Sequence, residues 1–301
     1  MLADIFGTVL LPIVLIVGVG FALGRLTRVD SRPLAVAVFY LFSPCLVFIS
    51  MAGTQVGADL LGKLALLKAL VIVSLIVLAI VVAAALRLSP VLRGAFILAV
   101  AFSNSGNFGL SVTEFAFGQA GVTLALICFV VDNLAVNSLG VYFAARGRAS
   151  VRGALLQVAG NPALYALALG LLVHEMGWQA PLAITRASET LGRAAVPTMQ
   201  TVLGIQLATL TFTPGHWKTI GWASVLSLVA APLLAALYVI PLGVTGLARQ
   251  VGILETAVPT AVSASIVATR YDSEPALVSG TVLVTSLLSL VTVTLVLYWM
   301  R

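Results

Sequence analysis

Charged side chains are scarce in this sequence: Asp, Glu, Lys and Arg together make up 9% of its 301 residues. Soluble domains carry about 25%, so this composition excludes an ordinary water-soluble fold. Cysteine is also scarce, and the two residues present, Cys45 and Cys128, both lie in apolar segments. They predict neither a disulfide framework nor a metal site. The N-terminus lacks the charged segment and cleavage site of a signal peptide, so we expect its first apolar run to be retained as a helix.

Motifs for nucleic-acid binding and for catalysis are missing as well. The net charge is +6, but the basic residues are scattered at the ends of apolar runs and form no patch. His174-Glu175 begins a zinc-binding H-E-x-x-H motif, but Trp178 occupies its fifth position. Tyr271-Asp272 resembles half of an intramembrane aspartyl protease motif and has no partner motif. We therefore expect no nucleic-acid partner, no enzyme activity and no cofactor.

Long apolar runs are what the sequence does contain, and they account for much of its 61% hydrophobic content. A hydrocarbon core of about 30 Å is crossed by about 20 helical residues, and only helices or closed barrels satisfy their backbone groups there. Continuous runs of this length favour helices over the short alternating strands of a barrel. The runs predict an all-α transmembrane fold of ten helices, at residues 5–24, 34–52, 64–86, 94–117, 120–144, 161–178, 188–208, 217–241, 247–269 and 275–299.

Basic residues in the short connections predict the orientation of these helices, because cytoplasmic loops carry an excess of Lys and Arg. The bias places the loop 146–152 in the cytoplasm and both termini outside, in a bacterial inner membrane. The richer side holds Arg25, Arg28, Arg32, Arg87, Arg93, Arg146, Arg148, Arg152, Lys218 and Arg270, and the other side holds Lys63, Lys68, Arg186, Arg193, Arg249 and Arg301.

Helix-breaking residues recur in the two halves of the chain at an offset of about 150 residues. Five spans in each half give the second half the opposite orientation, so we predict two inverted repeats, 1–148 and 149–301. The recurring features are Pro12 with Pro162, Pro44 with Pro197, and Ser103–Gly109 with Glu255–Pro259.

Spans 4 and 9 are expected to be broken near the membrane centre. In span 4, Asn104, Gly106, Asn107 and Gly109 follow one another closely, and each glycine costs a helix about 1 kcal/mol relative to alanine. In span 9, Pro259 removes a hydrogen-bond donor and clashes with the carbonyl four residues earlier. Paired breaks in inverted halves point to a transporter's central site, whereas plain close packing of small residues is the alternative.

The broken helices also predict the charge of a ligand. Each break leaves a helix N-terminus with unpaired amides, and each such end favours an anion by a few tenths to about 2 kcal/mol. The amides of Asn104 and Asn107 can donate to a carboxylate. A small organic anion is therefore the expected substrate.

Polar residues inside other spans are further candidates. Asp132, Asn133 and Asn137 lie in the middle of span 5, where a charged Asp costs about 2.5–3.5 kcal/mol and is usually functional. We expect substrate or proton contact there, or else a hydrogen bond between helices. Glu255 precedes Pro259 by one turn and is a candidate for Na⁺ or H⁺ coupling, as is Asp132. A structural pair of Glu255 with Arg249 or Arg270 is the alternative for that residue.

The order and spacing of these motifs resemble the auxin efflux carrier family, within the bile/arsenite/riboflavin transporter-like superfamily. Bacterial members of that family transport small carboxylates. The resemblance covers nearly the whole chain and is carried by Pro12, Pro44, Asn104–Leu110, Asn161-Pro162, Ala195–Pro197, Val258–Thr260 and the stretch 268–285.

The resemblance implies scaffold helices at about 5–52 and 161–208 and transport helices at about 64–144 and 217–299. It implies that spans 4 and 9 cross at the midplane, that the crossover moves as an elevator, and that the scaffold joins a homodimer. In the more distant bile acid–sodium symporters, helices 4 and 9 bind Na⁺. The family commonly has proline where this chain has Ser111, so the first break is expected to be milder. By resemblance, the site includes Asn104, Asn107, Asn133, Val258, Pro259 and Thr260.

Our first hypothesis is thus a secondary carrier of monocarboxylates or dicarboxylates, auxin-like acids included, in contact with membrane lipid. A Na⁺-coupled symporter of larger, bile-acid-like anions is the second. A membrane sensor that binds a ligand without transporting it is the third.

Overall fold

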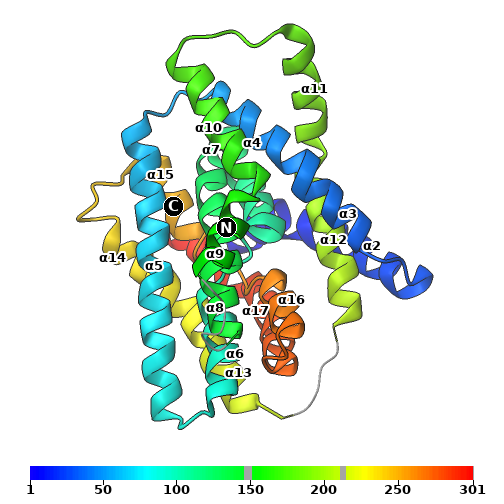
Figure 1. The fold of residues 1–301 in the computed structure, drawn as a ribbon, viewed down its shortest axis with the longest axis vertical. Coiled ribbons are helices and arrows are strands. Elements are labelled where there is room, and N and C mark those ends of the chain that lie inside the picture. Colours follow the sequence, from blue (N-terminus) through cyan, green and yellow to red (C-terminus); the bar gives the residue numbers. More distant parts are fainter. Residues whose placement is uncertain (146–150, 211–214, 301) are drawn as a thin grey trace.

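The computed structural model describes residues 1–145, 151–210 and 215–300, and these are helical almost throughout (Figure 1). The first half comprises α1 (Leu2–Ile5), η1 (Phe6–Leu10), α2 (Leu11–Thr27), α3 (Arg32–Ala37), η2 (Val38–Phe42), α4 (Ser43–Ala52), α5 (Ala58–Ala85), α6 (Pro90–Ala101), η3 (Ser105–Gly109), α7 (Leu110–Ala135), η4 (Val136–Gly140) and α8 (Val141–Ala144). The second half comprises α9 (Val151–Ala159), α10 (Pro162–Glu175), α11 (Leu182–Arg193), α12 (Ala195–Thr209), α13 (Trp217–Val225), η5 (Leu226–Ala230), α14 (Ala231–Tyr238), α15 (Gly246–Leu254), α16 (Val262–Arg270) and α17 (Pro275–Trp299).

Six helical stretches in the described ranges are long and apolar enough to cross a membrane. Two shorter apolar helices, α6 and α10, accompany them. The predicted all-α transmembrane class is therefore confirmed, while the inverted arrangement of ten helices stays a prediction. The six stretches are Leu2–Thr27, Arg32–Ala52, Ala58–Ala85, Ser105–Ala144, Trp217–Tyr238 and Pro275–Trp299.

Helix boundaries differ from the prediction where the chain is amphipathic. α9 falls in the connection that we expected between spans 5 and 6, of which residues 146–150 lie outside the described ranges. α11 begins at Leu182 rather than near 188, because its first turns carry polar residues that do not read as an apolar run. α7 joins the second part of predicted span 4 to span 5 and changes direction at Gly118, whose φ of 66° is left-handed.

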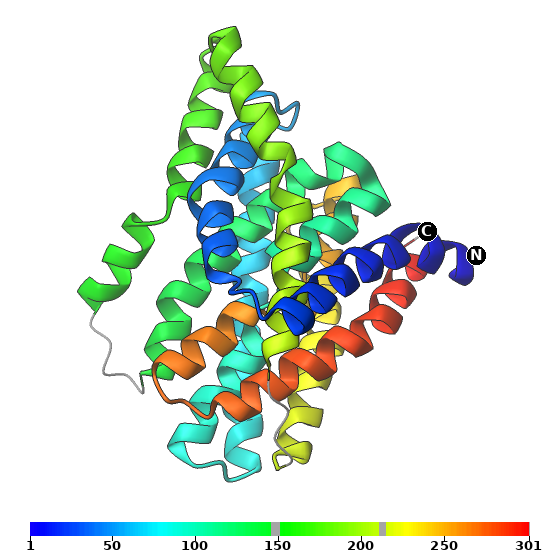
Figure 2. The same ribbon diagram turned by 90° about the vertical axis from the view of Figure 1, so that its right-hand side faces the viewer.

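Glycines let two pairs of helices cross at backbone distance. α2 packs against α12, where a Cβ on Gly204 would lie 2.6 Å from the backbone nitrogen of Phe21 and a Cβ on Gly20 would overlap the backbone of Thr201. α4 packs against α10, where a Cβ on Gly170 would lie 2.8 Å from a backbone oxygen of α4. A second group of helices packs together around α5, α6, α7 and α17. In Figure 2, α2 and α17 both run obliquely to α12.

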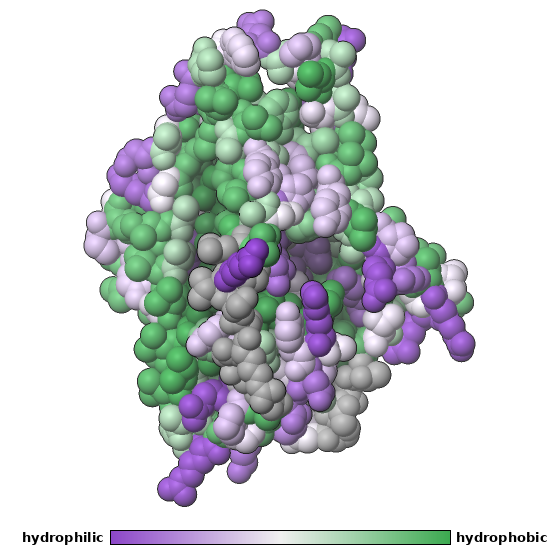
Figure 3. All heavy atoms as spheres, viewed as in Figure 1, coloured by the Kyte–Doolittle hydropathy of each residue, from purple (hydrophilic) through white to green (hydrophobic). Residues whose placement is uncertain are grey.

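The outer surface is largely apolar, as lipid contact requires. Large apolar side chains such as Leu15 of α2, Val77 of α5 and Leu287 of α17 are exposed. Apolar residues cover much of the face drawn in Figure 3, and hydrophilic ones lie at the upper tip, at the lower left, and at the centre and right of the view. The polar groups described next lie inside this apolar envelope.

Candidate functional site at two paired helix breaks

The two predicted breaks are present, and they are hydrogen-bonded to each other. The first follows α6 and the second follows α15. The backbone nitrogen of Asn104 donates to the carbonyl of Pro259 at 2.8 Å, and the nitrogen of Ala261 donates to the carbonyl of Phe102 at 2.9 Å. These bonds flank an antiparallel bridge between Ser103 and Thr260. Backbone that leaves the helix at membrane depth is thus satisfied by the other break, as the absence of water demands.

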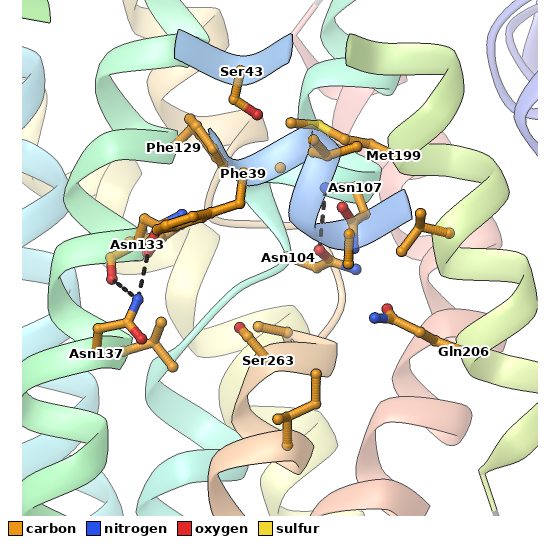
Figure 4. A pocket seen from close by; sticks show the side chains of 18 of the residues that line it. Phe39, Ser43, Asn104, Asn107, Phe129, Asn133, Asn137, Met199, Gln206 and Ser263 are labelled. Carbon is orange, nitrogen blue, oxygen red and sulfur yellow. Dashed lines mark hydrogen bonds between the residues drawn. The ribbon is translucent and has the colours of Figure 1, made fainter. Parts of the chain in front are cut away.

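Both helices that restart after the breaks begin at one cavity of about 360 Å³. η3 begins with Asn104 as its N-cap, whose side-chain oxygen accepts from the Asn107 nitrogen at 3.3 Å. α16 contributes Ser263 from its first turn. Figure 4 shows Asn104, Asn107 and Ser263 facing the same space, with Phe39, Phe129 and Met199 above them. Two helix N-termini at one cavity form an environment that favours an anion.

Six of the predicted site residues line this cavity, and the others do not. Val258 and Pro259 are absent from its walls, and so is Thr260, which instead braces the break. The Thr260 hydroxyl donates to the Ala99 carbonyl at 2.7 Å, and its nitrogen donates to the Thr285 hydroxyl at 3.1 Å. The lining residues that the sequence predicted are Asn104, Gly106, Asn107, Asp132, Asn133 and Asn137.

The glycines of η3 do not form the break, contrary to our expectation. The interruption lies upstream at residues 102–104, and Gly106 and Gly109 belong to the wide π-helical turn that follows it. Their role is steric: a Cβ on Gly106 would lie 2.9 Å from the ring of Phe129, and one on Gly109 would overlap the carboxylate of Glu255. The extended pairing with the second break, rather than weak helix propensity, interrupts the helix.

Asn133 and Asn137 on one wall of the cavity form a hydrogen-bonded group with Asn161, which does not itself line the cavity. The side-chain nitrogen of Asn137 donates to the side-chain oxygen of Asn133 at 2.9 Å and to its carbonyl at 2.8 Å. Asn161, which precedes α10, donates to the same side-chain oxygen at 3.2 Å and caps α10 through Ala163. The inter-helix hydrogen bond, one of our two alternatives for this group, is therefore present at Asn133, while substrate contact stays a prediction.

A buried lysine that sequence reasoning missed lies between the breaks. Lys68 of α5 is 2% exposed, and its Nζ forms an ion pair with Oδ2 of Asp132 at 2.9 Å. Nζ also donates to the Ser103 hydroxyl at 2.7 Å and to the Glu255 carbonyl at 2.8 Å. Ser105 contacts Asp132 through a short hydrogen bond. Asp132 thus faces the cavity on one side and this lysine on the other.

Our orientation count placed Lys68 in a loop, which was wrong. α5 begins at Ala58, so Lys68 lies ten residues into the helix, or about 15 Å at 1.5 Å per residue. That depth is about half of a hydrocarbon core. The exposed pair of Asp59 and Lys63, 2.7 Å apart with i,i+4 spacing, is the sequence signal that could have shown an earlier helix start.

Glu255 is fully buried at the end of α15 and does not reach the cavity. Its Oε1 accepts from the Thr113 hydroxyl of α7 at 2.8 Å. Within the described ranges, no ion pair joins it to Arg249 or Arg270, which was the structural alternative. It therefore links α15 to α7 beside the lysine cluster.

Several buried polar atoms at the site lack a hydrogen-bond partner among the described residues. They include Nδ2 of Asn104, Oδ1 of Asp132, Oε2 of Glu255 and Oε1 of Gln206. Figure 4 shows the amides of Asn104 and Gln206 facing each other across the cavity. Unpaired buried polar groups are costly, so a bound ligand or water is the expected partner for the two amides.

Comparisons with known proteins agree with a membrane transporter. A family described as "Membrane transport protein" matches residues 5–153 and 146–297. A protein of Methanocaldococcus jannaschii, named an uncharacterized transporter, is 26% identical over 67% of this chain and 67% of its own length. An uncharacterized transporter of Methanothermobacter thermautotrophicus is 30% identical over 66% of this chain and 65% of its own. A Rhizobium meliloti protein, provisionally named a malonate transporter, is 27% identical over 67% of this chain and 66% of its own.

Proposed function

The chain belongs to the membrane transport protein family, the auxin efflux carriers, and on that premise we propose that it is a secondary carrier of small organic anions. Its substrates are monocarboxylates or dicarboxylates, auxin-like acids included. The observation that carries this proposal is that both broken helices restart at one cavity with their N-termini.

The cavity supports a small, acidic substrate. Its volume of about 360 Å³ is at the lower end of the range for ligand pockets, about 300–1,000 Å³, which suits a short carboxylate better than a bile acid. Asn104 offers an unpaired amide donor, and Phe39, Phe129 and Met199 give the cavity an apolar part. The malonate in the name of the Rhizobium meliloti relative is a dicarboxylate of this size class.

Helix packing supports an elevator-type mechanism. We assign α1–α4 and α10–α12 to a scaffold, and α5–α8 with α13–α17 to a transport domain. Under a two-fold relation between the halves, the contact of α2 with α12 corresponds to that of α10 with α4. The contact of α6 with α17 corresponds in the same way to that of α15 with α7, and all four contacts are present. The family match also divides near residues 146–153. The cavity lies between α3, η2 and α12 on one side and η3, α7 and α16 on the other, which is where a moving domain exchanges its substrate.

The same proposal includes a location and an assembly. We place the chain in a bacterial inner membrane, with both termini outside and the loop 146–152 in the cytoplasm. Because Lys68 lies inside a helix, the outer side retains five basic residues and the cytoplasmic side ten. The correction therefore increases the bias that supports this orientation. A homodimer forms through the scaffold helices, whose exposed apolar residues include Leu15 and Leu169.

Uptake by proteoliposomes with a panel of radiolabelled carboxylates, malonate among them, tests the proposal. We expect saturable uptake of short acids, and reduced flux with unchanged expression in Asn107→Ala and Pro259→Ala. Ligand binding without flux in any condition would refute transport and leave the sensor. Uptake restricted to bile-acid-like anions would refute the substrate class.

A further inference from the structure

The ammonium group of Lys68 is enclosed by oxygen atoms. Ser103 Oγ lies 2.7 Å from Nζ, the Glu255 carbonyl 2.8 Å and Asp132 Oδ2 2.9 Å, and Ser105 Oγ lies at 3.4 Å. A lysine has three N–H donors, so the three nearest oxygens satisfy all of them. The side chain is 3% exposed and does not line the cavity. Lys68 is therefore not a group that contacts the substrate.

The oxygens are available to Lys68 because the helices are broken. Pro259 has no N–H, so the carbonyl four residues earlier, that of Glu255, loses its helical partner. That carbonyl is the one that accepts from Lys68. Ser103 lies in the other break, between α6 and η3. The ends of α6 and α15 are helix C-termini, where the macrodipole favours a positive charge.

Unwound carbonyls and helix C-terminal ends near the membrane midplane are the groups that bind Na⁺ in transporters with broken helices. Here a carbonyl, two hydroxyls and a carboxylate surround a covalently attached cation instead. We propose that Lys68 is a built-in substitute for a bound Na⁺ ion, so that anion transport by this chain needs no Na⁺. The inference rests on the proposed carrier function and on the geometry of the cluster.

The proposal assigns a positioning role to Lys68. Its charge joins α5 to both breaks and to Asp132 of α7. Without that charge, the carbonyl of Glu255 and the carboxylate of Asp132 would be buried without a cation, which is strongly unfavourable. A small cation that enters the vacated space would restore the balance. If Lys68 had only a packing role, its replacement would not make uptake or stability depend on Na⁺.

Na⁺ dependence of the full-length protein in proteoliposomes tests this inference. Malonate uptake by the unaltered chain is measured in Na⁺, K⁺ and choline media, together with thermal unfolding of the detergent-solubilised protein in the same salts. We expect no difference between the salts in either measurement. Lys68→Ala should lose uptake in choline and regain about tenfold in Na⁺, the effect of about 1.4 kcal/mol of restored interaction, and Na⁺ should raise its unfolding temperature.

Two further variants control for folding and for charge. Lys63→Ala removes an exposed lysine from the same helix and should behave as the unaltered chain. Lys68→Ala combined with Asp132→Asn removes the charge and its partner together, so it should fold without any response to Na⁺. Thermal unfolding reports these responses even where uptake is lost.

The outcomes separate this inference from the proposed function. Na⁺-dependent uptake by the unaltered chain, or Na⁺-independent uptake by Lys68→Ala, would overturn the role of Lys68 and leave the carrier intact. Absence of uptake of every tested anion would refute the carrier, while a Na⁺-induced stabilisation of Lys68→Ala alone would still support the cation site.

Discussion

Replacing Gly109 by alanine tests whether the carboxylate of Glu255 fixes the geometry of the crossover. The added methyl group would overlap Oε2 of Glu255 and lie 2.9 Å from its Cδ. The carboxylate cannot move easily, because Glu255 is fully buried and is held by Thr113 at 2.8 Å. Overpacking of this kind costs about 1–3 kcal/mol, while the better helix propensity of alanine returns about 1 kcal/mol.

We therefore expect Gly109→Ala to lose up to about 2 kcal/mol of stability, or up to roughly 8 °C in Tm, and to lower transport. Thermal unfolding in detergent and proteoliposome uptake measure the two effects. Gly18→Ala is the matched control, because nothing lies within 4 Å of a Cβ at that exposed position of α2.

A double-mutant cycle makes the test specific to Glu255. In a Glu255→Ala background the carboxylate is gone, so Gly109→Ala should cost little further stability, since contacting residues are non-additive. Equal losses from Gly109→Ala in both backgrounds, or a Gly109→Ala protein as stable as the Gly18→Ala control, would contradict the reasoning.

Three other predictions follow from the packing and the cavity. Gln206→Leu should raise the KM for a short carboxylate with little change in unfolding temperature, because its buried oxygen has no partner to lose; an unchanged KM would remove Gln206 from the site. Gly204→Ala should destabilise the protein more than Gly18→Ala, since its Cβ would meet the backbone of α2, and equal unfolding temperatures would contradict this. Asn161→Ala should cost about 0.5–2 kcal/mol as a lost N-cap and loosen Asn133; thermal unfolding and uptake would show it, and a neutral result would contradict the capping role.

The sequence allowed the breaks to be located because asparagine and proline act locally. Pro259 acts on a carbonyl four residues away, and Asn104 caps the helix that begins next to it. The amphipathic helices α9 and α11 were missed or shortened, because a search for apolar runs does not register a helix with one polar face.

The lysine cluster could not be read from the sequence, because it depends on depth and on contacts across the chain. A lysine near the start of an apolar run looks the same whether it anchors the helix at the interface or enters the core. The Nζ of Lys68 donates to the carbonyl of Glu255, which lies 187 positions away in the sequence. No local sequence pattern encodes a contact over that separation. Gly109 was predicted to break the helix, but its role is to leave room for the side chain of Glu255 from the other half of the chain.

The backbone pairing of the two breaks has a mechanical consequence. Two hydrogen bonds, between Asn104 and Pro259 and between Ala261 and Phe102, cross-link the halves of the chain as adjacent strands of a sheet are linked. Each bond satisfies a group that has no other partner in a dry interior, so separating the breaks would expose four unpaired backbone groups at once. In the elevator movement that we propose, a displacement of one break would therefore carry the other with it, and a ligand held between η3 and α16 would keep the same surroundings on that side.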